Sequence, residues 1–420
     1  MHFDDSQNRA IDLCCSDARI IAVSGAAGYG KTTIMREVYK LLSEKGYKCV
    51  MCAPTGKAAR RITQATNISA QTIHRMLEFP APYDIDETTG KPVTPGMPTR
   101  NRARPLDENC VLIDEAPMVP THLMRQIYEA LPAGGIVRMF GDMNQLPPIS
   151  DKERVAPFWE VLHKKRTYFD GSQVTYGAIL TTNHRQNDGS GIIINSEAII
   201  EGRYPRKYPD FKLFTTTSHT HTLKRLLSEN NIDFSSLDNQ IICPVHKGKV
   251  GTITLNEVLR RHYNSKPEKK IRLQRHAWFA DDAPYYVGIN DKVVMTKNWY
   301  DLGMSGVLNG EVGRVVDITA YNEMVVDFDP EVVTIPPVMS TTTRGMDATT
   351  NPQKDVDLAY AMTTHRAQGS EYDNVIYVID RYHNKVLNRN NFYTAITRAR
   401  CSVSVIYHPR AMSIALSKAW

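Results

Sequence analysis

Short apolar runs alternate along the chain with longer stretches of mixed character, and this alternation occurs in two separate regions. The apolar runs of the first region lie at residues 19–24, 49–53, 110–113 and 136–140, and those of the second at residues 240–243, 375–379 and 402–407. Strands of this length that alternate with helical stretches are typical of a parallel sheet covered by helices. The sequence therefore predicts two α/β domains, with ligands bound in the loops that follow the strands.

Two stretches depart from this pattern. Residues 79–105 are rich in Pro, Thr, Gly and Arg and poor in aliphatic residues, which predicts a hairpin inserted in the first domain, with a disordered linker as the alternative. Between residues 291 and 338, short alternating runs with glycine turns indicate a small all-β insertion. The expected domain bounds are 1–78 and 106–165 for the first domain, 79–105 for its hairpin, 166–288 and 355–420 for the second domain, and 289–354 for the β insertion.

Composition narrows the class of protein without identifying a partner. Of the 420 residues, 42% are hydrophobic, which is enough for two or three packed cores. The net charge of +6 favours a polyanionic partner only weakly. The seven scattered cysteines do not resemble a disulfide framework, and Cys49 and Cys52 form a Cys-x-x-Cys without a second pair to complete a zinc site. No leader and no apolar run of about 20 residues is found, so we expect a cytoplasmic protein without a membrane span.

The strongest chemical signal is a glycine-rich segment between a predicted strand and a predicted helix. It fits the phosphate-loop pattern G-x-x-x-x-G-K-[ST] at every fixed position. Its residues are Gly25, Ala26, Ala27, Gly28, Tyr29, Gly30, Lys31 and Thr32, with Thr33 directly after them. Glycines allow backbone N–H groups to approach a phosphate, and the start of the helix adds partial positive charge. We expect Lys31 to reach the β- and γ-phosphates and Thr32 to bind Mg²⁺.

A second signal is a pair of carboxylates, Asp114 and Glu115, directly after the apolar run at 110–113. At the edge of the sheet beside the phosphate loop, Asp114 can hold Mg²⁺ and Glu115 can polarise the attacking water. Buried or helix-capping carboxylates are the alternative for an isolated acidic pair. Together with the phosphate loop, the pair predicts hydrolysis of a nucleoside triphosphate.

The segments around these two motifs resemble, in order and spacing, those of superfamily-one helicases of the RecD-like and Dda-like branch, across nearly the whole chain. Gln7 resembles the family's adenine-reading glutamine, whose amide can bond two nitrogens of the base. Segments 53–59 and 72–74 resemble contacts with a nucleic-acid strand, which the resemblance assigns to Pro54, Thr55, Gly56 and His74. Pro117 stands where relatives usually carry serine, a departure that leaves both carboxylates in place.

The resemblance continues to the end of the first domain and through the second. In the first domain, segment 141–148 looks like the sensor loop, with Gln145 at the γ-phosphate. In the second, segments 180–186 and 393–400 look like motifs whose arginines, Arg185 and Arg398, stabilise charge on that phosphate. Segment 363–371 looks like the motif before the last, which implies strand contacts for Thr364 and His365 and nucleotide contacts for Gly369 and Glu371. Thr364 and His365 could instead be helix-capping or core polar residues, and either arginine could form a surface salt bridge.

The family resemblance implies two RecA-like parallel-sheet domains, with a hairpin inserted in the first and a small SH3-like β-barrel in the second. It also implies ATP-driven, Mg²⁺-dependent movement along single-stranded DNA from 5′ to 3′ by a monomeric motor that unwinds the duplex. RecD-like relatives carry a hairpin at the duplex junction, so we expect 79–105 to act as a wedge. Its candidate stacking residues are Phe79 and Tyr83, and its candidate phosphate contacts are Arg100, Arg102 and Arg104.

Two other functions stay open. An RNA helicase could share the phosphate loop, the acidic pair and the arginine-bearing last motif, although no obvious reader of the 2′-hydroxyl is present. A nucleotide-switched protein could clamp a nucleic-acid complex without unwinding it. The partners expected for a helicase are single-stranded DNA and single-strand/duplex junctions, with replication or recombination proteins as further candidates, and the expected cofactors are ATP and Mg²⁺.

Overall fold

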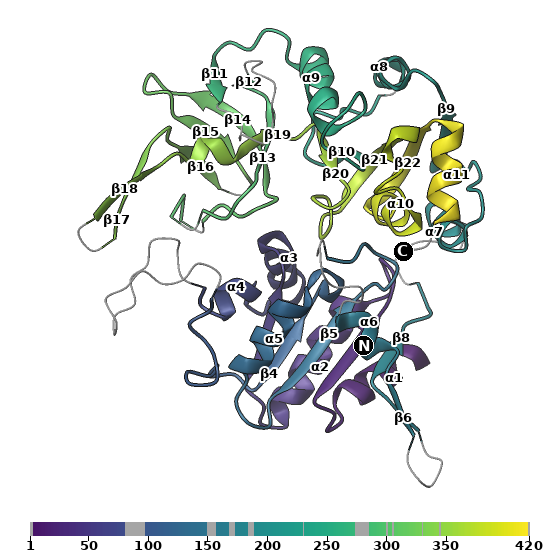
Figure 1. Cartoon of the computed structure of the whole chain (residues 1–420), viewed down its shortest axis with the longest axis vertical. Coiled ribbons are helices and arrows are strands. Elements are labelled where there is room, and N and C mark those ends of the chain that lie inside the picture. The colour runs from purple at the N-terminus through teal and green to yellow at the C-terminus, as the bar shows by residue number, and fades with distance from the viewer. Residues whose placement is uncertain are drawn as a thin grey trace. The chain divides into compact units, whose positions relative to one another are not determined.

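The computed structural model describes residues 3–79, 97–148, 157–167, 173–183, 189–229, 231–273, 285–299, 301–304, 306–329, 331–343 and 346–418. The chain forms two compact units, Met1–Asp188 and Gly189–Trp420 (Figure 1). Each unit contains a parallel sheet, and the second unit also carries an antiparallel sheet. No helix in the described ranges has the length and apolar character that crossing a membrane requires.

The sheet of the first unit has the strand order β3-β2-β4-β5-β1-β8, and its neighbouring strands are all parallel. Its strands are β1 (Ile20–Ser24), β2 (Cys49–Ala53), β3 (Ala70–Thr72), β4 (Cys110–Ile113), β5 (Ile136–Gly141) and β8 (Gly177–Ile179). The apolar runs predicted as strands of this domain are confirmed. Parallel pairing of β8 with β1 carries the first unit beyond the boundary expected at residues 165 and 166.

Helices cover both faces of this sheet. One face packs against α1 (Asp5–Cys14), α2 (Lys31–Glu44) and α3 (Gly56–Thr66), and the other against α4 (Ile73–Met76), α5 (Thr121–Ala130) and α6 (Pro157–Leu162). Successive strand residues alternate between these two apolar cores, as Ile21 and Ala22 do in β1. The remaining elements of the unit are η1 (Ala116–Met118) and a ribbon of β6 (Lys165–Thr167) and β7 (Gln173–Thr175).

The parallel sheet of the second unit has the order β20-β10-β21-β22-β9. Its strands are β9 (Phe211–Thr215), β10 (Asn239–Cys243), β20 (Ala361–Thr363), β21 (Tyr372–Ile379) and β22 (Ala399–Tyr407). The helices on one face are α7 (Gly191–Ile200), α10 (Arg389–Ile396) and α11 (Pro409–Ser417), and those on the other are α8 (His219–Glu229) and α9 (Thr252–Tyr263). The 3-10 turns are η2 (Pro352–Asp355) and η3 (Arg381–His383). The strands predicted for this domain are confirmed.

Antiparallel strands occupy the region of the predicted β insertion. They form a sheet of order β16-β15-β14-β13-β19, built from β13 (Lys292–Met295), β14 (Val312–Ile318), β15 (Met324–Asp327), β16 (Val332–Ile335) and β19 (Val356–Leu358). The flanking ribbons are β11 (Lys270–Leu273) with β12 (Tyr285–Gly288) and β17 (Met339–Thr343) with β18 (Met346–Thr350), and the second ribbon projects from the insertion (Figure 1). One apolar core runs from this sheet to α8 and α9. Whether the insertion is an SH3-like barrel stays a prediction.

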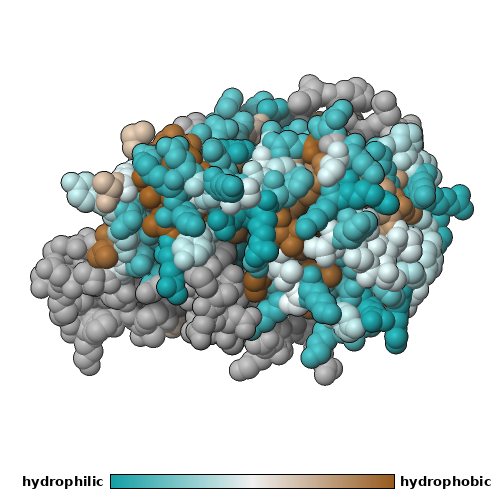
Figure 2. Space-filling model, turned by 90° about the horizontal axis from the view of Figure 1, so that it is seen from above, coloured by the Kyte–Doolittle hydropathy of each residue, from teal (hydrophilic) through white to brown (hydrophobic). Residues whose placement is uncertain are grey.

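The surface is largely polar. On the face that Figure 2 shows, hydrophilic residues predominate and apolar residues lie between them in small groups. Exposed large apolar residues of the second unit include Tyr204, Met304 and Tyr321. Dispersed residues of this kind are ordinary on a protein surface that faces water.

Candidate nucleotide and nucleic-acid site

The loops of the first unit that carry the predicted site residues meet at one edge of its sheet. They do so because the strands are parallel and each of these loops follows the carboxyl end of a strand. The loops after β3 and β2 contain the predicted contacts with a nucleic-acid strand, and those after β5 and β1 contain predicted nucleotide contacts. β4 lies between these two groups, so Asp114 and Glu115 stand between the two predicted sites.

The glycine-rich segment joins β1 to α2, as the sequence predicts. Gly28 and Gly30 have φ angles of 87° and 80°, in the left-handed region that favours glycine. Gly30 is the N-cap of α2, which begins at Lys31. A Cβ atom on Gly25 would lie 2.9 Å from Cδ1 of Leu180, so this position too is restricted to a small residue. The loop therefore presents backbone at the positive end of a helix, the arrangement that binds phosphate.

Lys31 lies against its own loop. Its Nζ donates to the carbonyl oxygens of Gly25 at 2.7 Å and Ala26 at 2.9 Å. Thr32 and Thr33 follow it in the first turn of α2 and are half-buried. The ammonium charge is thus held beside the backbone that would surround a phosphate, next to the Thr32 hydroxyl on the same helical turn.

Gln7 connects the start of α1 with the phosphate loop. Its Oε1 accepts a hydrogen bond from the backbone N–H of Asp4 at 3.2 Å, as part of a capping box. Its Nε2 donates to the carbonyl oxygen of Tyr29 at 3.4 Å, and the residue is 5% exposed. The predicted adenine-reading amide therefore lies at the loop, and both of its polar ends have backbone partners that a base would have to replace.

The two predicted carboxylates are both at the end of β4. The backbone N–H of Asp114 donates to the carbonyl oxygen of Cys52 at 2.9 Å, which extends the pairing of β4 with β2 by one residue. Glu115 is buried and has a φ of 50°, a strained value for a residue with a side chain. Burial and the charge of Glu115 raise the pKa of Asp114 to about 6, against the opposing effects of Lys31 and Arg61. A divalent cation would relieve the repulsion between these carboxylates.

Pro117, the residue that departs from the family pattern, packs against the end of β5. A Cβ atom on Gly141 would lie only 2.1 Å from Cδ of Pro117, so the proline ring occupies the space that a larger residue would need. Glycine at position 141 and proline at position 117 are therefore complementary. Their contact joins the loop of the two carboxylates to the sensor loop.

The sensor loop begins directly after β5. The backbone N–H of Met143 donates to Oγ of Ser24 at 3.0 Å, and Nε1 of Trp159 donates to the carbonyl oxygen of Met143 at 2.9 Å. Gln145 is 3% exposed, and within the described ranges its Oε1 has no hydrogen-bond partner. An unsatisfied buried acceptor is costly, and such atoms are found at sites that a ligand completes.

The loops after β2 and β3 hold the predicted strand contacts of the first unit. Thr55, which lies between Pro54 and Gly56, is the N-cap of α3. Its Oγ1 accepts a hydrogen bond from the backbone N–H of Ala58 at 3.3 Å. His74 is exposed on α4, and its ring centroid lies 4.7 Å from that of Phe79. Phe79 is half-buried against the core of the unit. Thr55 thus has a helix-capping role, whereas His74 is accessible to a ligand.

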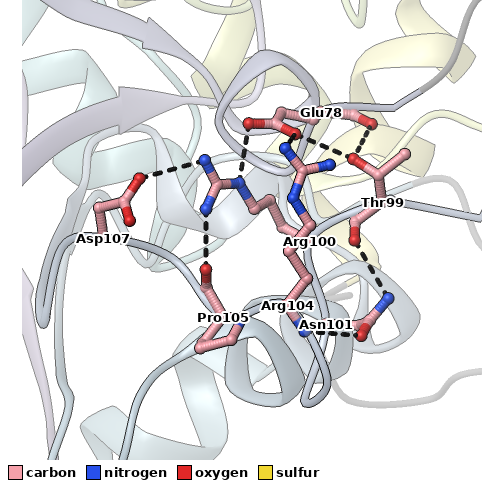
Figure 3. A network of polar contacts seen from close by, with 7 residues as sticks. All are labelled: Glu78, Thr99, Arg100, Asn101, Arg104, Pro105 and Asp107. Atoms are coloured by element: carbon pink, nitrogen blue, oxygen red, sulfur yellow. Dashed lines mark hydrogen bonds and ion pairs between the residues drawn. The ribbon is translucent and has the colours of Figure 1, made fainter.

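An ion-pair network holds two of the arginines that we expected near phosphates (Figure 3). Oε1 of Glu78 accepts from Nε of Arg100 at 2.8 Å, and its Oε2 lies 3.2 Å from Nη2 of Arg104. Arg100 also donates to Oδ2 of Asp107 at 3.1 Å, and its side chain is 17% exposed. Two carboxylates therefore compete with a phosphate for the guanidinium of Arg100, and its contact with a phosphate stays a prediction. Arg102 is exposed.

Residues 80–96, which include Tyr83, lie outside the described residues, and so does Arg185. The wedge and the role of Arg185 stay predictions.

In the second unit, Thr364 and His365 follow β20. Thr364 is fully buried, and its Oγ1 donates to Oδ1 of Asn391 at 2.9 Å, an atom that also accepts from the hydroxyl of Tyr377 at 2.7 Å. The expectation of a side-chain contact with the strand is corrected for Thr364, which is a core polar residue. The reason is that its backbone N–H still pairs with β10, which directs the hydroxyl into the core. His365 is half-buried, and burial and the charge of His246 lower its pKa.

Arg398 lies beside the other end of the 363–371 segment. It is 2% exposed, its Nε donates to the carbonyl oxygen of Thr394 at 3.1 Å and its Nη1 to that of Ser370 at 3.3 Å. Ser370 is flanked by Gly369, with a φ of 72°, and by Glu371. The structure therefore brings together Arg398, Gly369 and Glu371. The arginine is buried on neutral oxygens rather than placed in a surface salt bridge.

A basic loop after β10 was not predicted from the sequence. Lys247 and Lys249 are exposed, and Nδ1 of His246 lies 3.1 Å from Oγ1 of Thr252 at the start of α9. Because β10 and β20 are parallel, this loop lies at the same sheet edge as His365. The signal available in the sequence was a run of basic and glycine residues directly after a predicted strand. Exposed positive charges at such an edge suit contacts with a phosphate backbone.

The fold and the glycine-rich loop together define the class of protein. A parallel sheet whose first strand leads through a G-x-x-x-x-G-K-T loop into a helix is the architecture of phosphate-loop proteins. Residues 2–225, more than half of the chain, match the family model of an AAA domain, and residues 358–406 match that of a UvrD-like helicase C-terminal domain. The chain therefore belongs to this AAA-domain family.

Named relatives agree with this family. The chain is 29% identical over 383 residues to the ATP-dependent RecD2 DNA helicase of Deinococcus radiodurans, a match that covers 91% of this chain and 46% of that protein. It is 25% identical over 466 aligned positions to the RecD subunit of the RecBCD enzyme of Mycobacterium tuberculosis, covering 99% of this chain and 71% of that subunit. The chain thus spans about half the length of the first of these relatives.

A solved structure of similar fold is the Pif1 helicase of Bacteroides in complex with ADP-AlF3 and single-stranded DNA. The TM-score is 0.59 at 19% identity, and the match covers 96% of this chain and 92% of that one. At this identity the likeness concerns the fold. It is consistent with two RecA-like parallel-sheet domains in this chain.

Proposed function

We propose that this chain is an ATP-dependent helicase that moves along single-stranded DNA from 5′ to 3′ and unwinds duplex DNA. The observation that carries the proposal is the sheet edge of the first unit. There, the phosphate loop after β1 and the strand-contact loops after β2 and β3 flank Asp114 and Glu115. ATP hydrolysis at the phosphate loop can therefore change the conformation of the strand-contact loops on the other side of the two carboxylates. The name of one relative, the ATP-dependent RecD2 DNA helicase, supports the choice of DNA.

The reaction proposed for the site is attack of water on the γ-phosphate of ATP. Lys31 and the backbone N–H groups at the start of α2 would hold the β- and γ-phosphates. Glu115, buried beside them, would take the proton of the attacking water. The unsatisfied Oε1 of Gln145 would accept from that water and orient it. The base would be read by Gln7.

The residues of the site also fit Mg²⁺. The Thr32 hydroxyl and the Asp114 carboxylate are oxygen donors, which this ion prefers, and Asp114 is a carboxylate whose charge is destabilised by burial and by Glu115. When bound, Mg²⁺ would neutralise charge on the phosphate oxygens. Among the described residues no group of three or more His, Cys, Asp or Glu is placed so that it could hold a metal ion.

Movement requires that each unit hold the strand and release it as the nucleotide state changes. We assign the grip of the first unit to Pro54, Thr55, Gly56 and His74. We assign the grip of the second unit to His365 and the loop of Lys247 and Lys249. Arg398, with Gly369 and Glu371 beside it, would report the nucleotide state to the second unit.

The inserted segment is proposed as the element that separates the strands, with Phe79 at its base. Replacing residues 80–96 by a short glycine linker should preserve ATPase stimulation by single-stranded DNA and abolish unwinding. Loss of both activities together would contradict a separate wedge role.

The test of the function is a strand-displacement assay on duplexes with a 5′ or a 3′ single-stranded tail, in matched DNA and RNA versions. ATP-dependent displacement of the 5′-tailed DNA substrate alone is the expected result. Displacement of only the 3′-tailed substrate would overturn the polarity, and displacement of only RNA would overturn the substrate. ATP hydrolysis without displacement of any substrate would favour a nucleotide-switched clamp.

A further inference from the structure

A fully buried arginine lies beneath α1 in the first unit. Arg138 is the third residue of β5 and is 0% exposed. In the sheet it is level with Ile21 of β1 and Leu112 of β4, whose side chains belong to the apolar core under α1, α2 and α3. A charge in apolar surroundings is costly unless other groups compensate it. The contacts of the guanidinium therefore identify the groups that compensate its charge.

The compensation comes from backbone carbonyl oxygens. Nε donates to Cys14 at 2.5 Å, Nη2 to Ser16 at 2.9 Å, and Nη1 to Ala18 at 2.8 Å and to Val137 at 3.1 Å. Four of the five N–H bonds that an arginine can donate are therefore used. Three of them reach one short piece of chain, residues 14–18.

This piece of chain is the end of α1 and the turn that leads into β1. The last carbonyl groups of a helix lack partners within the helix, and a cation beside them is favourable. The last turn of α1 contains no basic residue of its own. From the sheet, Arg138 places a buried positive charge at this end and donates to the carbonyl oxygen of Cys14, the last residue of α1. It thereby ties the end of α1 to the strand that leads into the sensor loop.

The other end of α1 reaches the phosphate loop. Gln7 donates to the carbonyl oxygen of Tyr29, and Oγ of Ser6 accepts from the backbone N–H of Thr181 at 3.3 Å. The two ends of α1 lie at opposite edges of the sheet, because the turn after Cys14 leads to the start of β1 whereas Tyr29 follows its end. A helix of 10 residues is roughly 15 Å long and moves as one piece. A shift at its carboxyl end therefore shifts Gln7.

We propose that Arg138 is a positioning residue for recognition of the nucleotide base. By holding the carboxyl end of α1, it keeps the amide of Gln7 against the phosphate loop, where the adenine would be read. The inference rests on the proposed function, since it requires ATP hydrolysis and a base contact by Gln7. It affects selectivity more than catalysis, because Lys31, Glu115 and Gln145 lie outside α1.

The experiment measures steady-state hydrolysis of ATP and of GTP by the full chain with saturating single-stranded DNA. In Arg138→Gln, the KM for ATP should rise roughly tenfold, the effect of one or two lost hydrogen bonds, with little change in the KM for GTP. The kcat for ATP should change less than about threefold. Arg138→Lys, which keeps the charge, should lie between this variant and the parent chain.

The matched control is Lys45→Met. Lys45 donates to the carbonyl oxygen of Cys15 at 2.8 Å, so it is a second cation on the same turn, but this contact is exposed. The control should keep the parent's preference for ATP over GTP. An equal loss of preference in the control would mean that any cation on the turn suffices, and it would overturn the specific role of Arg138.

A double-mutant cycle with Gln7→Ala distinguishes failure of this inference from failure of the proposed function. Gln7→Ala alone should lower the preference for ATP, and Arg138→Gln should add nothing to it in that background. If Gln7→Ala lowers the preference and neither Arg138 variant does, the inference is overturned and the proposed function stands. Equal rises of both KM values in the Arg138 variants would also overturn it, as a general structural effect. Should Arg138→Gln not fold in thermal unfolding, Arg138→Lys decides. Absence of any nucleotide hydrolysis by the parent chain would overturn the proposed function itself.

Discussion

Both parallel sheets place a glycine-containing loop between a strand and a helix, yet the two loops offer different chemistry. In the first unit, β1 leads through residues 25–30 into α2, with two glycines at positive φ and the ammonium of Lys31 bonded inside the loop. In the second, β10 leads through residues 244–251 into α9; one glycine there, Gly248, has a positive φ of 98°, and the N-cap, Gly251, has a φ of −86°. There Lys247 and Lys249 are exposed.

The difference separates two ways of binding phosphate on the same framework. A loop that encloses its cation suits the terminal phosphates of one nucleotide, because many N–H groups converge on one point. A loop that exposes its cations suits the spaced phosphates of a strand, which are bound by charge and not by shape. The strand-loop-helix unit alone therefore does not identify the function; the conformation of a few loop residues does.

The largest effect on ATP hydrolysis is expected when the enclosed cation of the first loop is removed. Lys31→Ala should lower kcat for ATP hydrolysis by roughly three orders of magnitude, because the charge of the γ-phosphate would lose its main side-chain partner. Phosphate release with saturating single-stranded DNA measures this effect. Lys40→Ala, an exposed change on the same helix, is the control and should behave as the parent chain. Activity within tenfold of the parent in Lys31→Ala would contradict the phosphate site.

The next largest effect is expected if the second unit contributes to ATP hydrolysis. Arg398→Ala should lower kcat by roughly two orders of magnitude with a smaller change in KM, as expected for a group that acts on developing charge. Arg400→Ala, which removes an exposed arginine paired with Asp373, is the matched control. Pre-steady-state hydrolysis measures the effect directly. DNA-stimulated turnover at the parent's rate in Arg398→Ala would refute its assigned role.

The sheets could be predicted from the sequence because their central strands are continuous apolar runs, as at 110–113, and because the phosphate loop is defined by spacing. β8 could not, since it has three residues and depends on pairing with β1. The role of Thr364 was wrong because a motif gives the order of residues and not the direction of a side chain. Arg138 was not predicted as a functional residue, because one charge does not change the pattern of an apolar strand. The sequence signal that could have identified it is this single arginine within the apolar run at 136–140.

A second difference between the units lies in their cores: among the described residues, only the second unit contains buried histidines, His219 and His383. Burial lowers the pKa of His383 to about 4, against the opposing charge of Asp380. The unfolded chain takes up this proton near pH 6.5 and the folded chain only near pH 4, so the stability that depends on neutral His383 is present above pH 6.5 and is lost as the pH falls towards 4. The free energy of unfolding should fall by about 2 kcal/mol between pH 7 and pH 4.5 from this residue.

His383→Gln tests this difference, because glutamine can keep the capping contact with the backbone N–H of Asp380 and does not titrate. Urea unfolding followed by tryptophan fluorescence in a Trp159→Phe background reports on the second unit, since the other tryptophans, at 278, 299 and 420, belong to it. The variant should lose less stability than the parent between the two pH values. The same loss in both would show that His383 does not contribute to the acid sensitivity.

The smallest expected effect concerns the open loop, and it tests whether that loop binds a strand. Lys247→Ala combined with Lys249→Ala should weaken binding of single-stranded DNA several-fold at low salt. It should also reduce the slope of log K against log salt by about 1.4, the value for two lost phosphate contacts. Fluorescence anisotropy at several salt concentrations measures both quantities. Lys224→Ala with Arg225→Ala removes the same charge from an exposed part of α8 and should leave the slope unchanged. Equal slopes for the two double variants would mean that net charge alone attracts the strand, and the comparison between an enclosed and an open phosphate loop would then apply only to the first unit.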